Sequence, residues 1–210
     1  LETYNMDAKD LISKITPKSK AVMFVDALGN PSNIHSIKNI CQDHNLPLIE
    51  DAACALGSSE FDKKNGSIAD LTCFSFHPRK LLTTGEGGAI TTNNKAYADL
   101  LKVKLNHGAI YNNNKLDFIQ PGYNYRMTEF QAVMGIESLK KLNSVIFSRN
   151  KIKNKYINLL TPLGFTPQTL SSGAFHNIQS VIFQVPKDIK RDELILFLKS
   201  CGIESTLGTY

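Results

Sequence analysis

An acid, a hydroxyl and an amine follow two neighbouring apolar runs of the chain. Asp51 comes directly after the run that ends at Glu50, Ser75 lies at the end of the next run, and Lys80 follows that run. A lysine amine is a nucleophile once it has lost its proton, and a carboxylate holds protons or cations. A glycine-rich stretch at residues 83–88 supplies the positive φ angles of a tight turn. Together these residue types indicate a ligand site assembled from several loops.

The elements around these residues predict an α/β fold with a mostly parallel sheet. Residues 21–25 and 46–50 are short apolar runs typical of buried strands, and residues 33–44 between them form one apolar helical face. This order implies parallel strands joined by a right-handed crossover. Further strands are expected at 71–76 and 89–92. Because ligands bind at the carboxyl ends of strands in such sheets, the residues after each strand should share one edge.

The remaining chain predicts further helices and a second domain. We expect helices at residues 7–15, 94–106, 128–160 and 191–200, and a strand at 178–185. Thr128 and Gln131 fit a capping box at the start of the long helix, and Pro162 and Gly164 end it. The pattern changes within this helix. We therefore expect part of a large domain at residues 1–147 and part of a smaller α+β domain at 148–210.

Each candidate residue also has a structural interpretation. Asp51 can cap a helix or face solvent, Ser75 can belong to a turn, and most lysines such as Lys80 are ordinary surface residues. His77 has no second histidine or cysteine at ligand spacing, so we expect it to be structural and expect no metal. The order of these residues along successive strand ends favours a functional site.

Composition excludes several classes of protein. Of 210 residues, 42% are hydrophobic and 20% charged, which is typical of a globular chain and too apolar for a disordered one. The net charge of +5 comes from scattered lysines and arginines, which predicts no nucleic-acid partner. The four cysteines form no C-x-x-C pair and fit a reducing cytoplasm, and no apolar run is long enough to span a membrane.

The ordered motifs of the chain resemble the DegT/DnrJ/EryC1/StrS family of pyridoxal-phosphate-dependent sugar aminotransferases, which have aminotransferase fold type I. The resemblance extends from residues 3–7 to residues 202–204. Several motifs in order are far more specific than a single glycine loop. These motifs are Ile49-Glu50-Asp51-Ala52-Ala53, Phe74-Ser75-Phe76-His77-Pro78-Arg79-Lys80, Thr84-Gly85-Glu86-Gly87-Gly88 and Gly122-Tyr123-Asn124-Tyr125-Arg126-Met127.

The resemblance implies a role for four residues. Lys80 aligns with the lysine that binds the cofactor aldehyde and then carries a proton to and from the substrate carbon. Asp51 aligns with the carboxylate that pairs with the pyridine nitrogen, and Ser75 with a hydroxyl that binds the cofactor phosphate. Asn124 aligns with an asparagine that reaches the phosphate in the neighbouring subunit, which implies a homodimer with shared active sites.

The chain departs from the family pattern at several positions. Cys54 stands where many members carry a glutamine near the phenolic oxygen of the cofactor, and it is either a weaker cofactor contact or a small buried residue. Asp26 and Ala27 replace a histidine and an aromatic residue of many relatives. The chain starts at Leu1 and stops at Tyr210 within the pattern. We therefore expect a fragment that lacks an N-terminal segment with a Gly-Thr phosphate motif, and also lacks the C-terminal end.

The resemblance implies an enzyme of polysaccharide biosynthesis that uses a nucleotide-sugar and an amino acid donor. The amino group would pass from glutamate to a keto carbon of a nucleotide-linked sugar. One alternative is a sugar dehydratase of the same fold, against which Lys80 argues because the dehydratases carry a histidine there. A second alternative is an inactive piece that serves as a scaffold or dimerisation module. A third is a nucleic-acid-binding protein, which only the net positive charge suggests.

Overall fold

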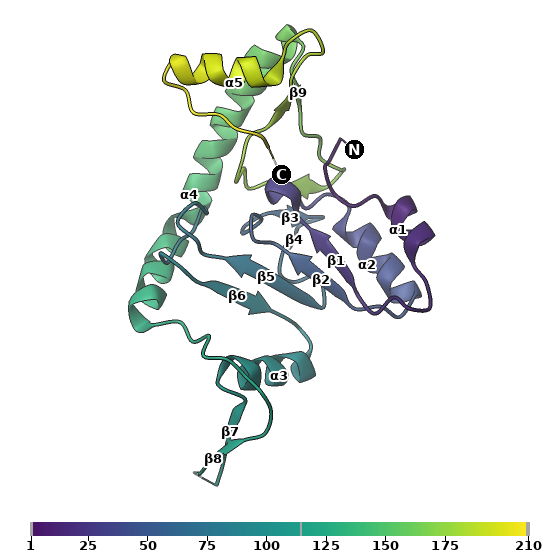
Figure 1. Cartoon of the computed structure of the whole chain (residues 1–210), viewed down its shortest axis with the longest axis vertical. Coiled ribbons are helices and arrows are strands. Elements are labelled where there is room, and N and C mark those ends of the chain that lie inside the picture. The colour runs from purple at the N-terminus through teal and green to yellow at the C-terminus, as the bar shows by residue number, and fades with distance from the viewer. Residues whose placement is uncertain (1, 114, 209–210) are drawn as a thin grey trace.

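A computed structural model describes residues 2–113 and 115–208, and its centre is a four-stranded sheet. The strands β1 (Val22–Val25), β2 (Leu48–Asp51), β5 (Leu71–Ser75) and β6 (Gly88–Thr91) lie side by side in that order (Figure 1). The pairs β1–β2 and β2–β5 are parallel, and β6 runs antiparallel to β5. The predicted α/β class with a mostly parallel sheet is confirmed.

Helices cover one face of this sheet. Helix α2 (Ile34–Asp43) connects β1 to β2, and α1 (Ala8–Lys14), capped by Asp7, packs against α2 (Figure 1). Alternate residues of β1 are buried and exposed, as expected for a strand with one covered face. The resulting core consists of Val22, Phe24, Ile34, Ile37, Cys41, Leu48 and Ala69.

Two segments differ from the expected pattern. No strand was predicted between residues 107 and 127, but β7 (Ala109–Asn112) and β8 (Lys115–Phe118) form an antiparallel hairpin. Hydrophobic residues on both sides of an asparagine-rich turn are typical of hairpins, and this signal was missed. The hairpin lies beside α3 (Lys95–Leu105), at the far end of the molecule from α5 (Figure 1).

The strand expected at residues 178–185 is present only as β11 (Phe183–Gln184), which pairs with β9 (Thr166–Pro167). The Arg149 guanidinium donates to the carbonyls of Ile178 and Gln179, at 2.6 and 2.9 Å. These carbonyls are therefore bound by a side chain and not by a neighbouring strand. A further small sheet, absent from the expectation, contains β10 (Ala174–Phe175), β3 (Ser59–Glu60) and β4 (Lys63–Lys64).

The long helix forms as predicted. Helix α4 (Glu129–Leu160) begins with the capping box of Thr128 and Gln131, and the 3₁₀ turn η2 (Thr161–Leu163) follows it. Helix α5 (Arg191–Ser200) has the predicted bounds. The domain boundary at residue 148 falls inside the continuous α4 and stays a prediction. In the part of the chain that the structure describes, no helix is long and apolar enough to cross a bilayer.

His176 is a buried histidine that joins two distant parts of the fold. Its Nε2 lies 3.0 Å from the carbonyl oxygen of Leu28, in the 3₁₀ turn η1 (Ala27–Gly29). Because the carbonyl only accepts hydrogen bonds, Nε2 carries the proton of a neutral ring. Burial, with a smaller contribution from the charge of Lys153, lowers the pKa of His176 from 6.5 to about 4.

We predict that His176 makes the protein less stable in acid. Since the unfolded chain binds this proton more tightly, stability falls as the pH drops from about 6.5 to about 4. The wild type should lose about 3 kcal/mol more than His176→Gln between neutral pH and pH ~4, at about 1.4 kcal/mol per pKa unit. Urea unfolding at each pH measures this difference. The exposed His44→Gln is the control, and an equal acid sensitivity of wild type and His176→Gln would contradict the prediction.

Candidate active site

The register of the sheet brings the acid and the hydroxyl to one face. Asp51 is paired with Val25 on one side and with Cys73 on the other, so these three side chains point the same way. Ser75 follows Cys73 by two residues and therefore shares that face. This face lies opposite α2, where the side chains of Met23 and Val25 are 58% and 50% exposed. Asp51 and Ser75, both half-buried, therefore share the face of the sheet opposite α2.

Glu50 points the other way, into a buried polar cluster. The Asn65 side-chain amide donates to Glu50 Oε1 and to Asp26 Oδ2, at 2.6 and 2.7 Å, and the Thr72 hydroxyl donates to Glu50 Oε2 at 2.6 Å. Burial, together with the nearby Glu50 carboxylate, raises the pKa of Asp26 well above its ordinary value. Asp26 is 1% exposed and therefore cannot contact a substrate on the Asp51 face.

The structure brings Lys80 and Cys54 into direct contact. The Nζ of Lys80 donates to the Sγ of Cys54 at 3.1 Å, and both residues are half-buried. Asp51 Oδ1 accepts a hydrogen bond from the backbone N–H of Ala53 at 3.0 Å. The carboxylate therefore shapes the turn after β2 that carries Cys54 toward the amine. Cys54 thus belongs to the site, although its predicted contact with a cofactor stays a prediction.

The loop between β5 and β6 holds Lys80 within a set of short local bonds. The N–H of His77 donates to the Ser75 hydroxyl at 3.3 Å, and the N–H of Lys80 donates to the carbonyl of His77 at 2.9 Å. At the end of this loop Gly87 has a φ of +143°, and a Cβ there would lie 2.7 Å from Thr84 Oγ1. The glycine is therefore required by the turn that returns the chain to β6.

Asn124 lies apart from the other predicted site residues. It is exposed and forms an isolated β-bridge with Asn106, beside the stacked rings of Tyr123 and Tyr125, whose centroids are 4.9 Å apart. In the described ranges 2–113 and 115–208, Asn124 makes no side-chain hydrogen bond to Asp51, Ser75 or Lys80. Within one chain, the structure therefore joins Asp51, Ser75, Cys54 and Lys80 without Asn124.

Two residues that sequence reasoning missed hold the site together. Asn177 Nδ2 donates to the carbonyls of Cys54 and Leu56, at 2.8 and 3.0 Å. Gln179 donates to the carbonyl of Arg79 at 2.8 Å and accepts from the N–H of Leu81 at 3.1 Å, so it binds the backbone on both sides of Lys80. In the sequence, these two amides stand at the start of the apolar run that predicts a strand, and this was the only signal for them. Their partners lie about a hundred residues or more away in the chain.

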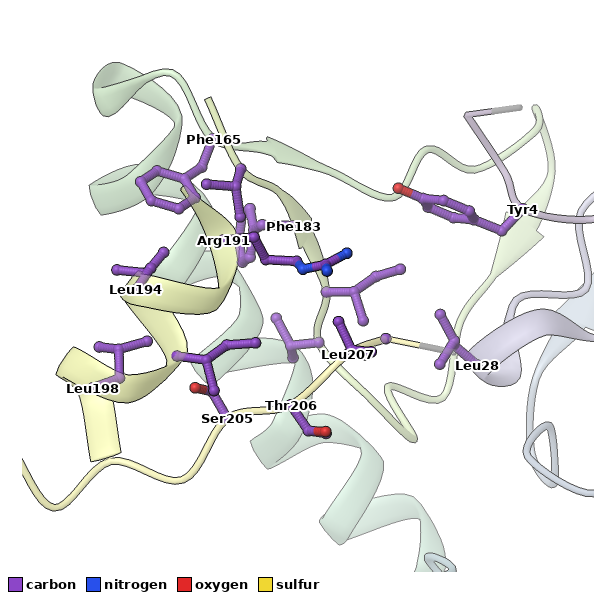
Figure 2. A pocket seen from close by; sticks show the side chains of 15 residues that line it. Tyr4, Leu28, Phe165, Phe183, Arg191, Leu194, Leu198, Ser205, Thr206 and Leu207 are labelled. Atoms are coloured by element: carbon purple, nitrogen blue, oxygen red, sulfur yellow. The ribbon is translucent and has the colours of Figure 1, made fainter. Parts of the chain in front are cut away.

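An apolar cavity of about 380 Å³ lies elsewhere, between α5 and β11. Figure 2 shows the Arg191 side chain projecting among apolar side chains that include Phe165, Phe183 and Leu194. No predicted site residue lines this cavity. The predicted site residues therefore lie at the edge of the sheet and not in this cavity.

The chain matches known proteins over almost its whole length. Residues 1–208 match the DegT/DnrJ/EryC1/StrS aminotransferase family. The chain is 33% identical to the GDP-perosamine synthase of Vibrio cholerae over 206 residues, which cover 97% of this chain and 56% of that protein. It is 40% identical over 158 residues to a Campylobacter jejuni UDP-4-amino-4,6-dideoxy-N-acetyl-beta-L-altrosamine transaminase, covering 72% of this chain and 42% of that protein. The chain thus spans about half the length of these relatives.

Solved structures support the same relationship. Helicobacter pylori PseC, an aminotransferase involved in the biosynthesis of pseudoaminic acid, superposes with a TM-score of 0.94 at 26% identity, over 100% of this chain and 58% of that one. The putative sugar aminotransferase Spr1654 of Streptococcus pneumoniae, in its PMP form, gives 0.90 at 25% identity, over 100% of this chain and 59% of that one. The chain belongs to the DegT/DnrJ/EryC1/StrS aminotransferase family, whose enzymes depend on pyridoxal phosphate.

Proposed function

We propose that this chain is part of a pyridoxal-phosphate-dependent aminotransferase that acts on a nucleotide-linked sugar in polysaccharide biosynthesis in the cytoplasm. The amino group comes from an amino acid donor, glutamate, and is received by a keto carbon of the sugar. The observation that carries the proposal is the placement of Asp51 and Ser75 on one open face of the sheet, in a chain that matches this family throughout. The relatives named above support the sugar-nucleotide substrate.

The donor groups of the site fit the cofactor. An aldehyde requires an amine, a pyridine nitrogen requires an acid, and a phosphate requires hydroxyl and N–H donors. Lys80, Asp51 and Ser75 supply these groups, and the last two share a face of the sheet. When bound, the cofactor supplies an electron sink for negative charge at the reacting carbon.

Each residue then has a separate task. Lys80 Nζ would bind the aldehyde of the cofactor, and its free amine would hold and move the proton of the substrate carbon. Asp51 keeps the proton on the ring nitrogen, and Ser75 orients the phosphate. Asp26 takes no part, because it is buried on the other side of the sheet with Glu50. The same lysine serves both half-reactions, which predicts ping-pong kinetics.

One fold-related activity remains as a second candidate. An Escherichia coli GDP-4-keto-6-deoxy-D-mannose-3-dehydratase with bound hydrated PLP superposes with a TM-score of 0.88 at 26% identity. The lysine at position 80 favours amino transfer over dehydration, since a covalent bond to the cofactor needs this amine. Release of a deoxygenated sugar without transfer of an amino group would support the dehydratase instead. A folded protein that binds no cofactor would support a scaffold or dimerisation role.

We predict that Lys80→Ala abolishes the covalent attachment of pyridoxal phosphate in the intact protein that contains this chain. Wild-type protein mixed with the cofactor should show the visible absorbance of a lysine-bound ring, and borohydride reduction should fix the adduct on Lys80. Mass spectrometry of the peptides measures the site. The exposed Lys95→Ala is the control and should behave as the wild type. An adduct of normal yield in Lys80→Ala would contradict the assignment.

Gln179 should act as a positioning residue for Lys80. Gln179→Ala removes both bonds to the Lys80 loop, and each lost hydrogen bond costs about 1 kcal/mol. We therefore expect on the order of tenfold weaker cofactor retention, measured by dialysis and absorbance, with little change in overall folding by circular dichroism. The matched control Gln184→Ala alters an exposed glutamine in β11. Equal retention by the two variants would show that the Gln179 contacts do not position the lysine.

The predicted homodimer with shared sites has support from exposed apolar residues on the first turns of α4. Phe130 is 86% exposed, and Val133, Ile136 and Leu139 on the same helix are also exposed. A surface this apolar is typical of an interface. Asn124 lies just before this helix and, among the residues that the structure describes, makes no side-chain hydrogen bond to its own Lys80, which fits a role in a partner's site.

We predict that Lys80→Ala and Asn124→Ala subunits restore activity when they are mixed. In a mixed dimer with shared sites, one site combines the intact Lys80 of one subunit with the intact Asn124 of the other. The measurement is amino transfer to the sugar after the two variants are unfolded and refolded together. Each variant refolded alone is the control. No gain on mixing would place both residues in the same subunit's site, or show that the protein is a monomer.

A further inference from the structure

The thiol of Cys54 and the amine of Lys80 form an unusual pair. Their Sγ and Nζ atoms are 3.1 Å apart, close enough for a bond to form with little movement. Both side chains are half-buried, so small solutes can reach them. In the described part of the chain, Cys41, Cys73 and Cys201 have no lysine nitrogen within hydrogen-bond distance. Cys54 therefore differs from the other three cysteines in having an amine as its direct neighbour.

The backbone keeps this pair together. Asn177 binds the carbonyl of Cys54, and Gln179 binds the residues on both sides of Lys80. Because these two amides lie on one short segment, the two loops are held to a common support. The short Sγ–Nζ distance is thus a consequence of the fold and not of one side-chain rotamer alone.

We propose that Cys54 and Lys80 form an oxidative lock, which is a reversible covalent sulfur–nitrogen bond made when a hydroperoxide oxidises the thiol. The peroxide transfers one oxygen to the thiolate, which gives a sulfenic acid, and is itself reduced to water or an alcohol. The neutral Lys80 amine then attacks the sulfur. The S–O bond breaks, hydroxide leaves, and the proton lost by nitrogen converts it to water. The product is lighter than the reduced protein by two hydrogen atoms.

The lock has a consequence that rests on the proposed function. Lys80 Nζ cannot bind the cofactor aldehyde while it is bonded to sulfur, so the oxidised protein does not take up pyridoxal phosphate. Protein already loaded with the cofactor is protected, because its lysine nitrogen is engaged. An added dithiol attacks the sulfur, returns the hydrogens to thiol and amine, and leaves as a disulfide.

Mass spectrometry of cofactor-free protein treated with hydrogen peroxide tests the lock. We expect a product lighter by two hydrogens, a crosslinked peptide pair that contains residues 54 and 80, and its loss after dithiothreitol. Cys54→Ser should abolish the crosslink. In Lys80→Arg the crosslink should be absent, while dimedone should label Cys54 as a sulfenic acid. These two variants separate the oxidation step from the bond-forming step.

Controls separate the lock from other products of oxidation. A disulfide between Cys54 and Cys73 has the same mass change, so Cys73→Ser should keep the crosslink. A crosslink that disappears in Cys73→Ser, or a Cys54 that is oxidised with Lys80 left free, would overturn the proposal. The crosslink is read without the cofactor, so its absence in protein that binds pyridoxal phosphate refutes the lock alone. Failure to bind the cofactor before any oxidation refutes the proposed function alone.

Discussion

The parallel register of β1, β2 and β5 is the constraint on which the site depends. Two backbone hydrogen bonds continue it past the strand ends, from Asp26 N to Asp51 O at 3.1 Å and from Ala52 N to Cys73 O at 2.9 Å. A shift of β2 by one residue would turn Asp51 toward α2 and Glu50 toward the open face. Strand pairing therefore selects which of the two adjacent acids lies on the face opposite α2.

The buried cluster around Glu50 makes such a shift costly. Asn65, Thr72 and the backbone N–H of Gly66 all donate to the Glu50 side chain, so this buried polar group has hydrogen-bond partners. Asp51 in that position would have a shorter side chain and would leave donors unpaired. The shared amide of Asn65 also binds Asp26 to the cluster, where burial favours its protonated form. The polar core thus specifies which of the two acids is buried and which lies on the face opposite α2.

Contacts between distant segments complete the arrangement. The segment that contains His176, Asn177 and Gln179 follows the long helix α4, yet it binds the η1 turn, the Cys54 turn and the Lys80 loop. These loops come from three different strand ends that are far apart in the sequence. A single segment that binds all three gives the lysine and the thiol a defined separation, which is a requirement for covalent chemistry at the amine.

The sequence by itself determined the α/β class, the bounds of the main helices and strands to within a few residues, and the residues that resemble the family's site. Apolar periodicity and the capping box of Thr128 and Gln131 are local signals, so they can be read along the chain. Only the tertiary structure decided that Glu50 is buried, that Cys54 meets Lys80, and that Asn177 and Gln179 support both. These results depend on strand register and on hydrogen bonds between segments far apart in sequence, for which periodicity carries no information.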